Sequence, residues 1–290
     1  MTLNADWLAA LHARASQAPL HPRVPLLAGG MVIGSVLSEI VDKIGTFPSW
    51  DIDSLLLKQE YLGELAWGIQ GDLTASLVRV ARALHEANIG HVRYHWRDEQ
   101  LAVLGDQGQR LGSVERGAVR PLGIATRAVH LVGQTPDGRV WVQQRALDKS
   151  NDPGQWDTLM GGMVSAQDAL GTALARETWE EAGLVIEDLQ AVTHGGGVRV
   201  QRPTADAGDG AKDSGIDAGI DARIGYMVET IDWFHCTVPD GMVPVNQDGE
   251  VAQFKLLTHA ELAASLQRGE FTLEAALVLV AAFGLREWKF

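Results

Sequence analysis

Three glutamates in the second half of the chain are spaced to share one face of a helix. Glu177, Glu180 and Glu181 stand at positions i, i+3 and i+4, so at 3.6 residues per turn their side chains point the same way. Most such clusters are solvated acidic surfaces, and three adjacent carboxylates repel one another. A hard cation would offset the repulsion, because Mg²⁺ binds carboxylate oxygens together with waters and substrate phosphates. The spacing alone therefore indicates either an acidic surface or a magnesium site.

The net charge of the chain bears on the choice between these two interpretations. The 290 residues carry a formal charge of −13 at pH 7, and Lys and Arg form no basic run. Proteins that bind nucleic acid cluster basic residues to neutralise phosphates, so we expect no nucleic-acid partner. An acidic protein also repels a phosphate-bearing substrate, and a cation held by carboxylates would remove that conflict. The charge therefore directs attention to carboxylates that could hold a metal.

A longer pattern surrounds the three glutamates. It consists of Gly162, Arg176, Glu177, Glu180, Glu181, Gly183 and Leu184. This pattern resembles the signature of the Nudix hydrolases, and chance agreement over so many positions is negligible. One position departs from it, since Asp168 stands where the family has glutamate. That residue braces the arginine of the motif in the family, and Asp168 would brace Arg176 with a slightly different reach.

The resemblance implies a metal-dependent site that cleaves a diphosphate linkage. Glu177 and Glu181 would be the principal ligands of Mg²⁺, with Mn²⁺ as the alternative metal. Glu180 would be an additional or water-mediated partner, and the carbonyl of Gly161 a backbone ligand. Together with Arg176 these glutamates form the predicted catalytic site. The bound cation would polarise phosphoryl oxygens and offset developing charge.

Further candidates for contact with the substrate lie outside the helix. Arg145 and Lys149 could hold phosphate oxygens, although solvated surface charges are as common. Trp156 offers an aromatic face and Asp157 a carboxylate to a flat cationic heterocycle, and each could equally belong to the core or the surface. Glu250 follows an Asp-Gly turn signal and is the candidate for a further catalytic carboxylate, the alternative being a simple turn that opens a strand.

A narrower resemblance extends over most of the chain. Its segments are similar to Nudix proteins that carry an additional N-terminal α/β domain and are associated with thiamine pyrophosphokinase. This resemblance implies hydrolysis of thiamine diphosphate, or an oxidised analogue, to the monophosphate. Each segment is weak alone, and their order and spacing carry the resemblance. The segments lie at 96–99, 115–116, 121–124, 129–131, 145–157 and 246–251.

Rival functions stay open at this point. ADP-ribose or another nucleoside diphosphate derivative is the alternative substrate of a hydrolase. A binding protein on a disabled Nudix scaffold is an alternative of another class, and Asp168 is its only support. Isopentenyl diphosphate isomerase shares the fold, but it uses a catalytic cysteine in a strand before the motif helix. The single cysteine of this chain, Cys236, lies well after that helix.

The chain divides at residue 122 into two predicted α/β units. Residues 1–122 would form a smaller domain of unclear role, and the resemblance implies a Nudix α/β/α sandwich with a mixed sheet for residues 123–290. Asp137-Gly138 predicts a hairpin turn, and Gly161-Gly162 is expected in a turn before the motif helix. A Gly-, Ala- and Asp-rich segment, 203–223, is expected to be a flexible insertion. Helices are predicted at 5–17, 74–87, 166–182, 259–267 and 272–283, and strands at 29–37, 184–193, 225–238 and 251–257.

The setting and partners of the protein follow from what the sequence lacks. No apolar run approaches the ~20 residues that span a bilayer, so we expect no membrane partner. The N-terminus has no signal-peptide pattern, and one cysteine cannot form an intrachain disulfide, so a reducing cytoplasm is the expected compartment. The expected partner is a small diphosphate, and a homodimer is left open.

Overall fold

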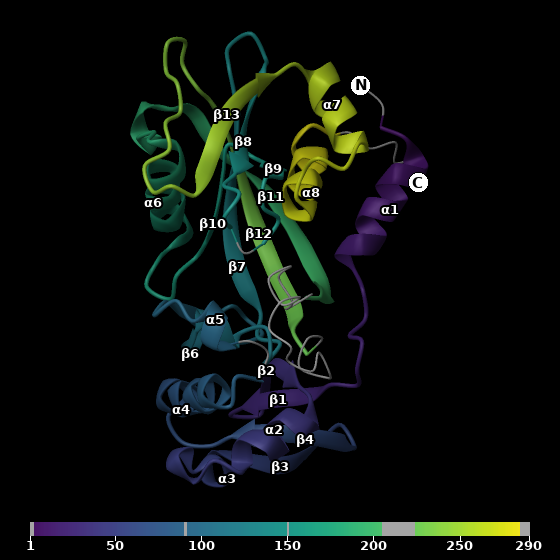
Figure 1. Ribbon diagram of the computed structural model, residues 1–290, viewed down its shortest axis with the longest axis vertical. Coiled ribbons are helices and arrows are strands. Elements are labelled where there is room, and N and C mark those ends of the chain that lie inside the picture. The colour runs from purple at the N-terminus through teal and green to yellow at the C-terminus, as the bar shows by residue number, and fades with distance from the viewer. Residues whose placement is uncertain (1–2, 90–91, 150, 205–223, 285–290) are drawn as a thin grey trace.

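Two α/β units lie end to end along the longest axis of the molecule (Figure 1). The computed structural model describes residues 3–89, 92–149, 151–204 and 224–284. The N-terminal unit occupies one end in Figure 1, and the unit that contains the acidic motif occupies the other. This arrangement agrees with the predicted fold class, a mixed α/β unit preceded by a smaller α/β unit.

The N-terminal unit is built on a four-stranded sheet with the order β2-β1-β4-β3. Helix α4 packs against its core through Leu77, Val80 and Leu84, and Asp72 caps the helix by accepting from the amide of Ala75. The helix predicted at 74–87 is thus confirmed. The elements are β1 (Val24–Ala28), β2 (Met31–Val36), α2 (Ser38–Gly45), α3 (Ile52–Leu55), β3 (Leu56–Tyr61), β4 (Glu64–Ile69), α4 (Leu73–Glu86), α5 (Val92–His95), β5 (Gln100–Leu104) and β6 (Arg110–Glu115).

The second unit is built on a seven-stranded mixed sheet. Its main path is β11-β12-β7-β8-β13, with β10 paired to β7 and β9 paired to β8. Strand β12 runs parallel to β7, and the other pairs are antiparallel. The predicted hairpin lies between β7 and β8, and the mixed sheet is confirmed. The strands are β7 (Thr126–Gln134), β8 (Val140–Arg145), β9 (Trp156–Asp157), β10 (Met160–Met163), β11 (Gln190–Pro203), β12 (Tyr226–Thr237) and β13 (Val251–Leu257).

Helices cover both faces of this sheet (Figure 1). Helix α6 (Leu170–Ala182) packs on one face through Ala173 and Leu174. Helices α7 (His259–Gln267) and α8 (Leu273–Ala282) pack on the other, where Leu262 and Leu277 join the core. The result is an α/β/α sandwich, and α7 occupies the predicted residues.

The predicted boundary at residue 122 assigned the first helix of the chain to the N-terminal unit. In the structure this helix belongs to the sandwich. Helix α1 (Ala5–Ala15) packs against α8 and β11, and it lies beside α8 in Figure 1. The physical reason is the apolar side of this segment. Leu3, Leu11 and Ala15 are buried in the same core cluster as the residues of α8.

The motif helix starts later than its predicted first residue, 166. Helix α6 begins at Leu170, with Ala169 at its N-cap, and the preceding residues form a turn. Gly161 and Gly162 lie in strand β10 and not in a turn, since they pair with His130 and Val129 of β7. The sheet pairing therefore determines the backbone of both glycines.

Three other predictions have mixed outcomes. The strand expected at 184–193 is present only from Gln190, where β11 begins, and the residues before it include a 3₁₀ turn at Ile186–Asp188. The segment expected to be an insertion, 203–223, lies outside the described residues from position 205 onward. Within the described residues, no helix is both long and apolar enough to cross a membrane.

Candidate active site

Glu181 is the innermost of the three motif glutamates. Its carboxylate oxygen Oε2 accepts hydrogen bonds from the amide of Gly161 at 3.0 Å and from Nε2 of Gln143 at 2.7 Å. The side chain is buried, and burial raises its pKa to about 8, with the charges of Glu177 and Asp157 adding to the shift. The fold thus holds this carboxylate in low-polarity surroundings with two hydrogen-bond donors, and no cationic side chain among the described residues pairs with it.

Glu177 lies against the second glycine of β10. A Cβ atom added to Gly162 would lie only 2.0 Å from Cδ of Glu177, so the Glu177 side chain would have to shift to accommodate any larger residue. Burial raises the pKa of Glu177 to about 7; Arg176 opposes that shift, and Glu180 and Glu250 reinforce it. The close approach of Glu177 therefore favours glycine at this position of strand β10.

Arg176 lies at the centre of the acidic residues. Its Nη1 donates to Glu177 at 2.8 Å and to Glu180 at 3.1 Å, and its Nη2 donates to Asp168 at 2.9 Å. Nη2 also donates to the carbonyl of Met163 at 3.2 Å. The shorter Asp168 therefore reaches the arginine, and the bracing implied by the resemblance is present in the structure.

The described residues fit a divalent cation with two carboxylates better than with three. In the described ranges, no three His, Cys, Asp or Glu side chains are arranged to hold a metal ion. The reason is that Glu180 is 43% exposed and pairs with Arg176, while Glu181 turns to the Gly161 amide. Mg²⁺ needs only one or two protein carboxylates besides waters and phosphates. The pair Glu177 and Glu181 meets that need, since Glu177 is partly buried beside Arg176 and Glu181 is buried with no cationic partner among the described residues.

The predicted carboxylate outside the helix lies near this pair. Glu250 is half-exposed, and its charge contributes to the raised pKa of Glu177 after the larger effect of burial. Its carboxylate accepts from Nζ of Lys149, another predicted site residue. The amide of Ala146 donates to the Glu250 carbonyl at 2.9 Å, which joins the loop after β8 to the start of β13. The structure therefore brings Glu250 and Lys149 together beside the motif.

The remaining predicted substrate contacts are engaged within the protein. Asp157 is buried, and it accepts from the amide of Thr158 at 2.8 Å and from the hydroxyl of Thr272 at 3.3 Å. Nη1 of Arg145 lies 3.8 Å from the same carboxylate. Trp156 is partly buried and packs against the core on the α8 side. Asp157 and Trp156 thus serve first to join β9 to the start of α8.

Two buried polar residues of the site were missed from the sequence. Gln143 is 1% exposed, donates to Glu181, and leaves its own Oε1 without a protein partner among the described residues. His130 is buried with its Nδ1 3.0 Å from Thr158 Oγ1, and it packs directly against Gly161. A signal existed for Gln143, because it follows the continuous apolar run VWV of β8 with a polar residue.

Removal of the Gln143 amide is expected to lower activity without unfolding the protein. In Gln143→Leu, Glu181 would keep only the Gly161 amide as a donor, so its carboxylate would be less firmly oriented. We expect turnover of the cognate substrate to fall by about tenfold or more, in the range of lost outer-sphere contacts. Steady-state kinetics and circular dichroism test this, and unchanged turnover in a folded variant would show that the contact is dispensable.

Sequence comparisons agree with this geometry. A family model described as NUDIX domain matches residues 125–277. The chain is 29% identical over 162 residues to "Nudix hydrolase 20, chloroplastic" of Arabidopsis thaliana, covering 55% of this chain and 38% of the plant protein. It is 33% identical over 98 residues to an isopentenyl-diphosphate Delta-isomerase of Saccharopolyspora erythraea, covering 32% of this chain and 49% of that enzyme.

This chain matches only part of the length of its curated relatives. The matched segments span 38%, 56% and 44% of the length of three curated relatives. Among solved structures, DR0079 of Deinococcus radiodurans superposes with a TM-score of 0.46 at 18% identity, over 65% of this chain and 100% of that protein.

Proposed function

Because the chain belongs to the Nudix family, we propose that it is a hydrolase that cleaves a diphosphate linkage with the aid of a divalent cation. One observation carries the proposal: the partly buried carboxylate of Glu177 and the buried carboxylate of Glu181 lie against the glycine pair of β10, and Arg176 braces the first of them. A disabled binding scaffold has no need for two carboxylates so close that the charge of Glu177 raises the pKa of Glu181. The intact motif therefore supports catalysis over a purely binding role.

Glu177 and Glu181 would hold the cation, which we propose to be Mg²⁺ with Mn²⁺ as the alternative. Glu180 is the additional partner, because it is exposed and shares Arg176 with Glu177. When bound, the metal would polarise the phosphoryl oxygens and offset the charge that develops on them. Arg176 keeps Glu177 in place, and the bare backbone of Gly162 lets the Glu177 carboxylate lie against β10.

The residues around the cation would complete the reaction. We propose Glu250 as the base that accepts the proton of the attacking water, since its carboxylate is half-exposed and lies near Glu177. As the water oxygen bonds to phosphorus, the bond to the bridging oxygen breaks, and two phosphate-bearing products leave. Lys149, which pairs with Glu250, would bind phosphate oxygens on releasing it, and Arg145 lies near the same loop.

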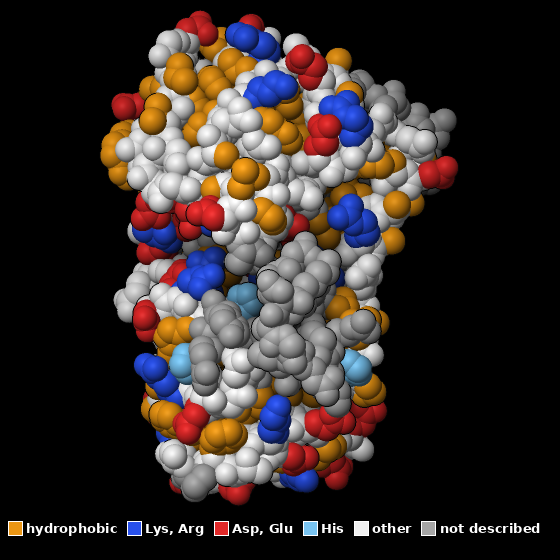
Figure 2. Space-filling model, viewed as in Figure 1, with side chains coloured by type: hydrophobic (Ala, Val, Ile, Leu, Met, Phe, Trp, Pro, Cys, Tyr) orange, Lys and Arg blue, Asp and Glu red, His pale blue; other side chains and the backbone are white. Residues whose placement is uncertain are grey.

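Thiamine diphosphate, or an oxidised analogue of it, is the substrate that we propose first. Its support is the order of the sequence segments from 96–99 to 246–251, which run through both units. A nucleoside diphosphate derivative such as ADP-ribose is the alternative. On the face shown in Figure 2, the described basic side chains lie among acidic ones and form no continuous stripe, which agrees with a small-molecule substrate.

Isomerisation of isopentenyl diphosphate is the least favoured reading, despite the match to the isomerases. That chemistry needs a reactive cysteine near the site. Cys236 is buried in the core between the sheet and α6, and burial raises the pKa of its thiol to about 12. The only cysteine is thus an inert core residue, as the sequence suggested.

A screen of diphosphates tests the proposed function. With Mg²⁺ present, thiamine diphosphate is expected to release inorganic phosphate and the monophosphate, because the site clamps a terminal diphosphate. EDTA is expected to abolish release, and added Mg²⁺ to restore it. If the protein released AMP from ADP-ribose and did not hydrolyse thiamine compounds, the nucleoside diphosphate derivative would replace thiamine diphosphate as the proposed substrate. No hydrolysis of any diphosphate would refute the hydrolase.

A further inference from the structure

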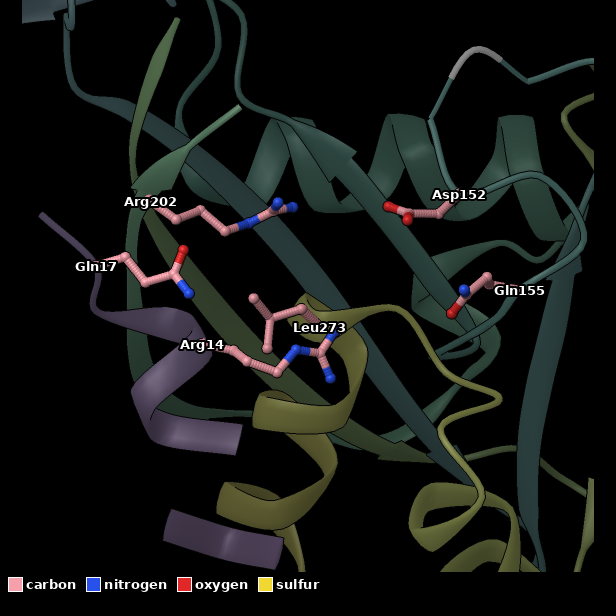
Figure 3. Close-up of a pocket in the computed structure, with 6 residues that line it drawn as sticks. All are labelled: Arg14, Gln17, Asp152, Gln155, Arg202 and Leu273. Carbon is pink, nitrogen blue, oxygen red and sulfur yellow. The ribbon is translucent and has the colours of Figure 1, made fainter. Parts of the chain in front are cut away.

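The part of the chain before residue 122 contacts the sandwich at two separate places. At the first, Arg14 of α1 and Leu273 of α8 line a polar pocket on the sheet face opposite α6 (Figure 3). At the second, strand β5 of the N-terminal unit pairs with the segment that leads from β10 into α6, which we call the joining segment, residues 164–169. Only the second contact adjoins the motif helix.

The contact between β5 and the joining segment is made by the backbone. Leu101 of β5 forms an antiparallel bridge with Ser165, and the amide of Ala166 donates to the carbonyl of Gln100 at 2.7 Å. Leu101 and Ala166 are both buried, so this hydrogen bond is shielded from water. The N-terminal unit therefore holds the joining segment directly.

Strand β5 is anchored in its own unit. It pairs with β6, where Leu101 lies opposite Val114. Both residues are buried in the core that also contains Leu77 and Val80 of α4. Strands buried in a core open least readily, so β5 presents a fixed edge to the joining segment.

A series of contacts runs from this edge to the carboxylate of Glu177. The start of α6 is not fixed by a cap, since Ala169 occupies the N-cap without a side-chain hydrogen bond. Within the joining segment, the amide of Asp168 donates to the carbonyl of Ser165 at 3.2 Å. The carboxylate of Asp168 accepts from Nη2 of Arg176 at 2.9 Å, and Nη1 of Arg176 donates to Glu177 at 2.8 Å. The position of Glu177 thus depends on where the joining segment lies.

Met163, the last residue of β10, keeps the two units together beside this series. Its side chain packs against the core of the N-terminal unit and against a core of the sandwich. Its carbonyl accepts from Nη2 of Arg176 at 3.2 Å. Loss of the pairing with β5 would therefore release the joining segment without separating the units.

We propose that the N-terminal unit positions Arg176 and Glu177 for metal binding, through the pairing of β5 with the joining segment. Without that pairing, Asp168 would move away from Arg176, and Glu177 would lose its fixed orientation. A ligand whose supporting contacts are lost binds its metal less tightly. Gln100 and Leu101 are thus positioning residues of the active site. This inference rests on the proposed role of Glu177 as a metal ligand, and it gives the N-terminal unit a part in the reaction.

Ala166→Pro in the full-length protein removes the amide that donates to Gln100. Ala166 and Gln167 are the central residues of the turn that the Asp168 amide closes, and neither has a positive φ. Proline is favoured at the first central position of such a turn, and the extended backbone of Ser165 suits the residue before a proline. The variant therefore keeps the turn and loses the contact with β5.

The dissociation constant of Mn²⁺, measured without substrate by electron paramagnetic resonance, is the readout. We expect Ala166→Pro to raise it by about tenfold or more, in the range of lost outer-sphere contacts. The matched control is Asp106→Pro, at the exposed first central position of the turn that the Gly108 amide closes onto Gly105 at 2.9 Å, and it should leave the constant unchanged. An unchanged constant in folded Ala166→Pro overturns this inference alone. A wild-type protein that binds no Mn²⁺ overturns the proposed metal site as well.

A double-mutant cycle tests whether the effect passes through Asp168. Asp168→Asn keeps the shape of the side chain and removes the charge that holds Arg176, so we expect it to weaken Mn²⁺ binding by itself. Adding Ala166→Pro to Asp168→Asn should then have little further effect, because both changes break the same series of contacts. Fully additive effects would show that the pairing acts by another route and would overturn the inference.

Hydrogen exchange of the wild-type protein decides the matter if Ala166→Pro does not fold. The amide of Ala166 must stay bonded to β5, so we expect it to exchange about a hundredfold or more slowly than in an unstructured peptide. NMR measures this rate residue by residue. Exchange as fast as that of the amide of Asp106, in its exposed turn, would show that β5 does not hold the joining segment and would overturn the inference.

Discussion

Replacement of Glu181 by glutamine is expected to lower turnover of the diphosphate substrate by at least about a hundredfold while the protein stays folded. The amide keeps an oxygen that can accept from Gly161 and Gln143, so the local packing survives. It loses the charge with which the carboxylate would hold the cation. Steady-state kinetics at saturating Mg²⁺ measure the effect. Turnover within a few-fold of the wild type would show that Glu181 is not a ligand of the catalytic metal.

The stability of the same variant gives an independent check on the buried charge. Burial raises the pKa of Glu181 to about 8 in the folded protein, above the usual value of 4.5. Its contribution to stability is therefore fully present below pH 4.5 and is lost as the pH rises through about 8. At pH 8 the metal-free Glu181→Gln protein is expected to melt no lower than the wild type. Glu187→Gln, an exposed carboxylate just after α6, should change neither activity nor melting temperature.

The elements that sequence reasoning located well are those that local residues determine. Helix α4 follows its cap at Asp72, and α7 begins after Thr258, whose side chain and that of Glu261 form a capping box. The hairpin between β7 and β8 turns at Asp137-Gly138, where Gly138 has a φ of 83°. Each of these signals lies within a few residues of the structure that it sets, so no knowledge of tertiary packing was needed.

The elements that were misplaced depend on distant partners. The destination of α1 is set by apolar residues of α8, more than 250 positions away in the chain, and nothing within α1 distinguishes the two cores. The strand at Gly161-Gly162 exists because β7 supplies its hydrogen bonds, and glycine pairs rarely form strands by local preference. The start of α6 was placed at residue 166, four residues too early, because the residues before Leu170 form a turn.

The sequence predicted which motif residues belong to the site, but not how their side chains pair with one another. Periodicity placed Glu177, Glu180 and Glu181 on one helix face, but it could not say that Arg176 would draw Glu180 outward. Gln143 contributes from β8, 38 positions before Glu181, and only the sheet brings the two together. A side chain that acts across strands leaves at most a polar residue after an apolar run, which is too weak a pattern to assign a role.

Substitution of Gly162 by alanine is expected to lower activity about a hundredfold with little loss of stability. The new Cβ would meet Cδ of Glu177 at 2.0 Å, and the neighbour that must move is the flexible end of a side chain. The backbone of β10 can therefore stay paired with β7 while the Glu177 carboxylate is displaced from the cation site. The same displacement should raise the Mg²⁺ concentration needed for half-maximal activity, which a metal titration of turnover would measure.

Gly171→Ala is the matched control, because Gly171 lies in the first turn of α6 and a Cβ there meets nothing within 4 Å. Alanine favours a helix over glycine by up to about 1 kcal/mol, so this variant is expected to melt at or slightly above the wild-type temperature with full activity. If Gly162→Ala were as active as Gly171→Ala, the contact between Gly162 and Glu177 would have no part in catalysis. If Gly162→Ala unfolded, the expectation of little stability loss would be wrong, because glycine would then be needed for β10 to pair with β7.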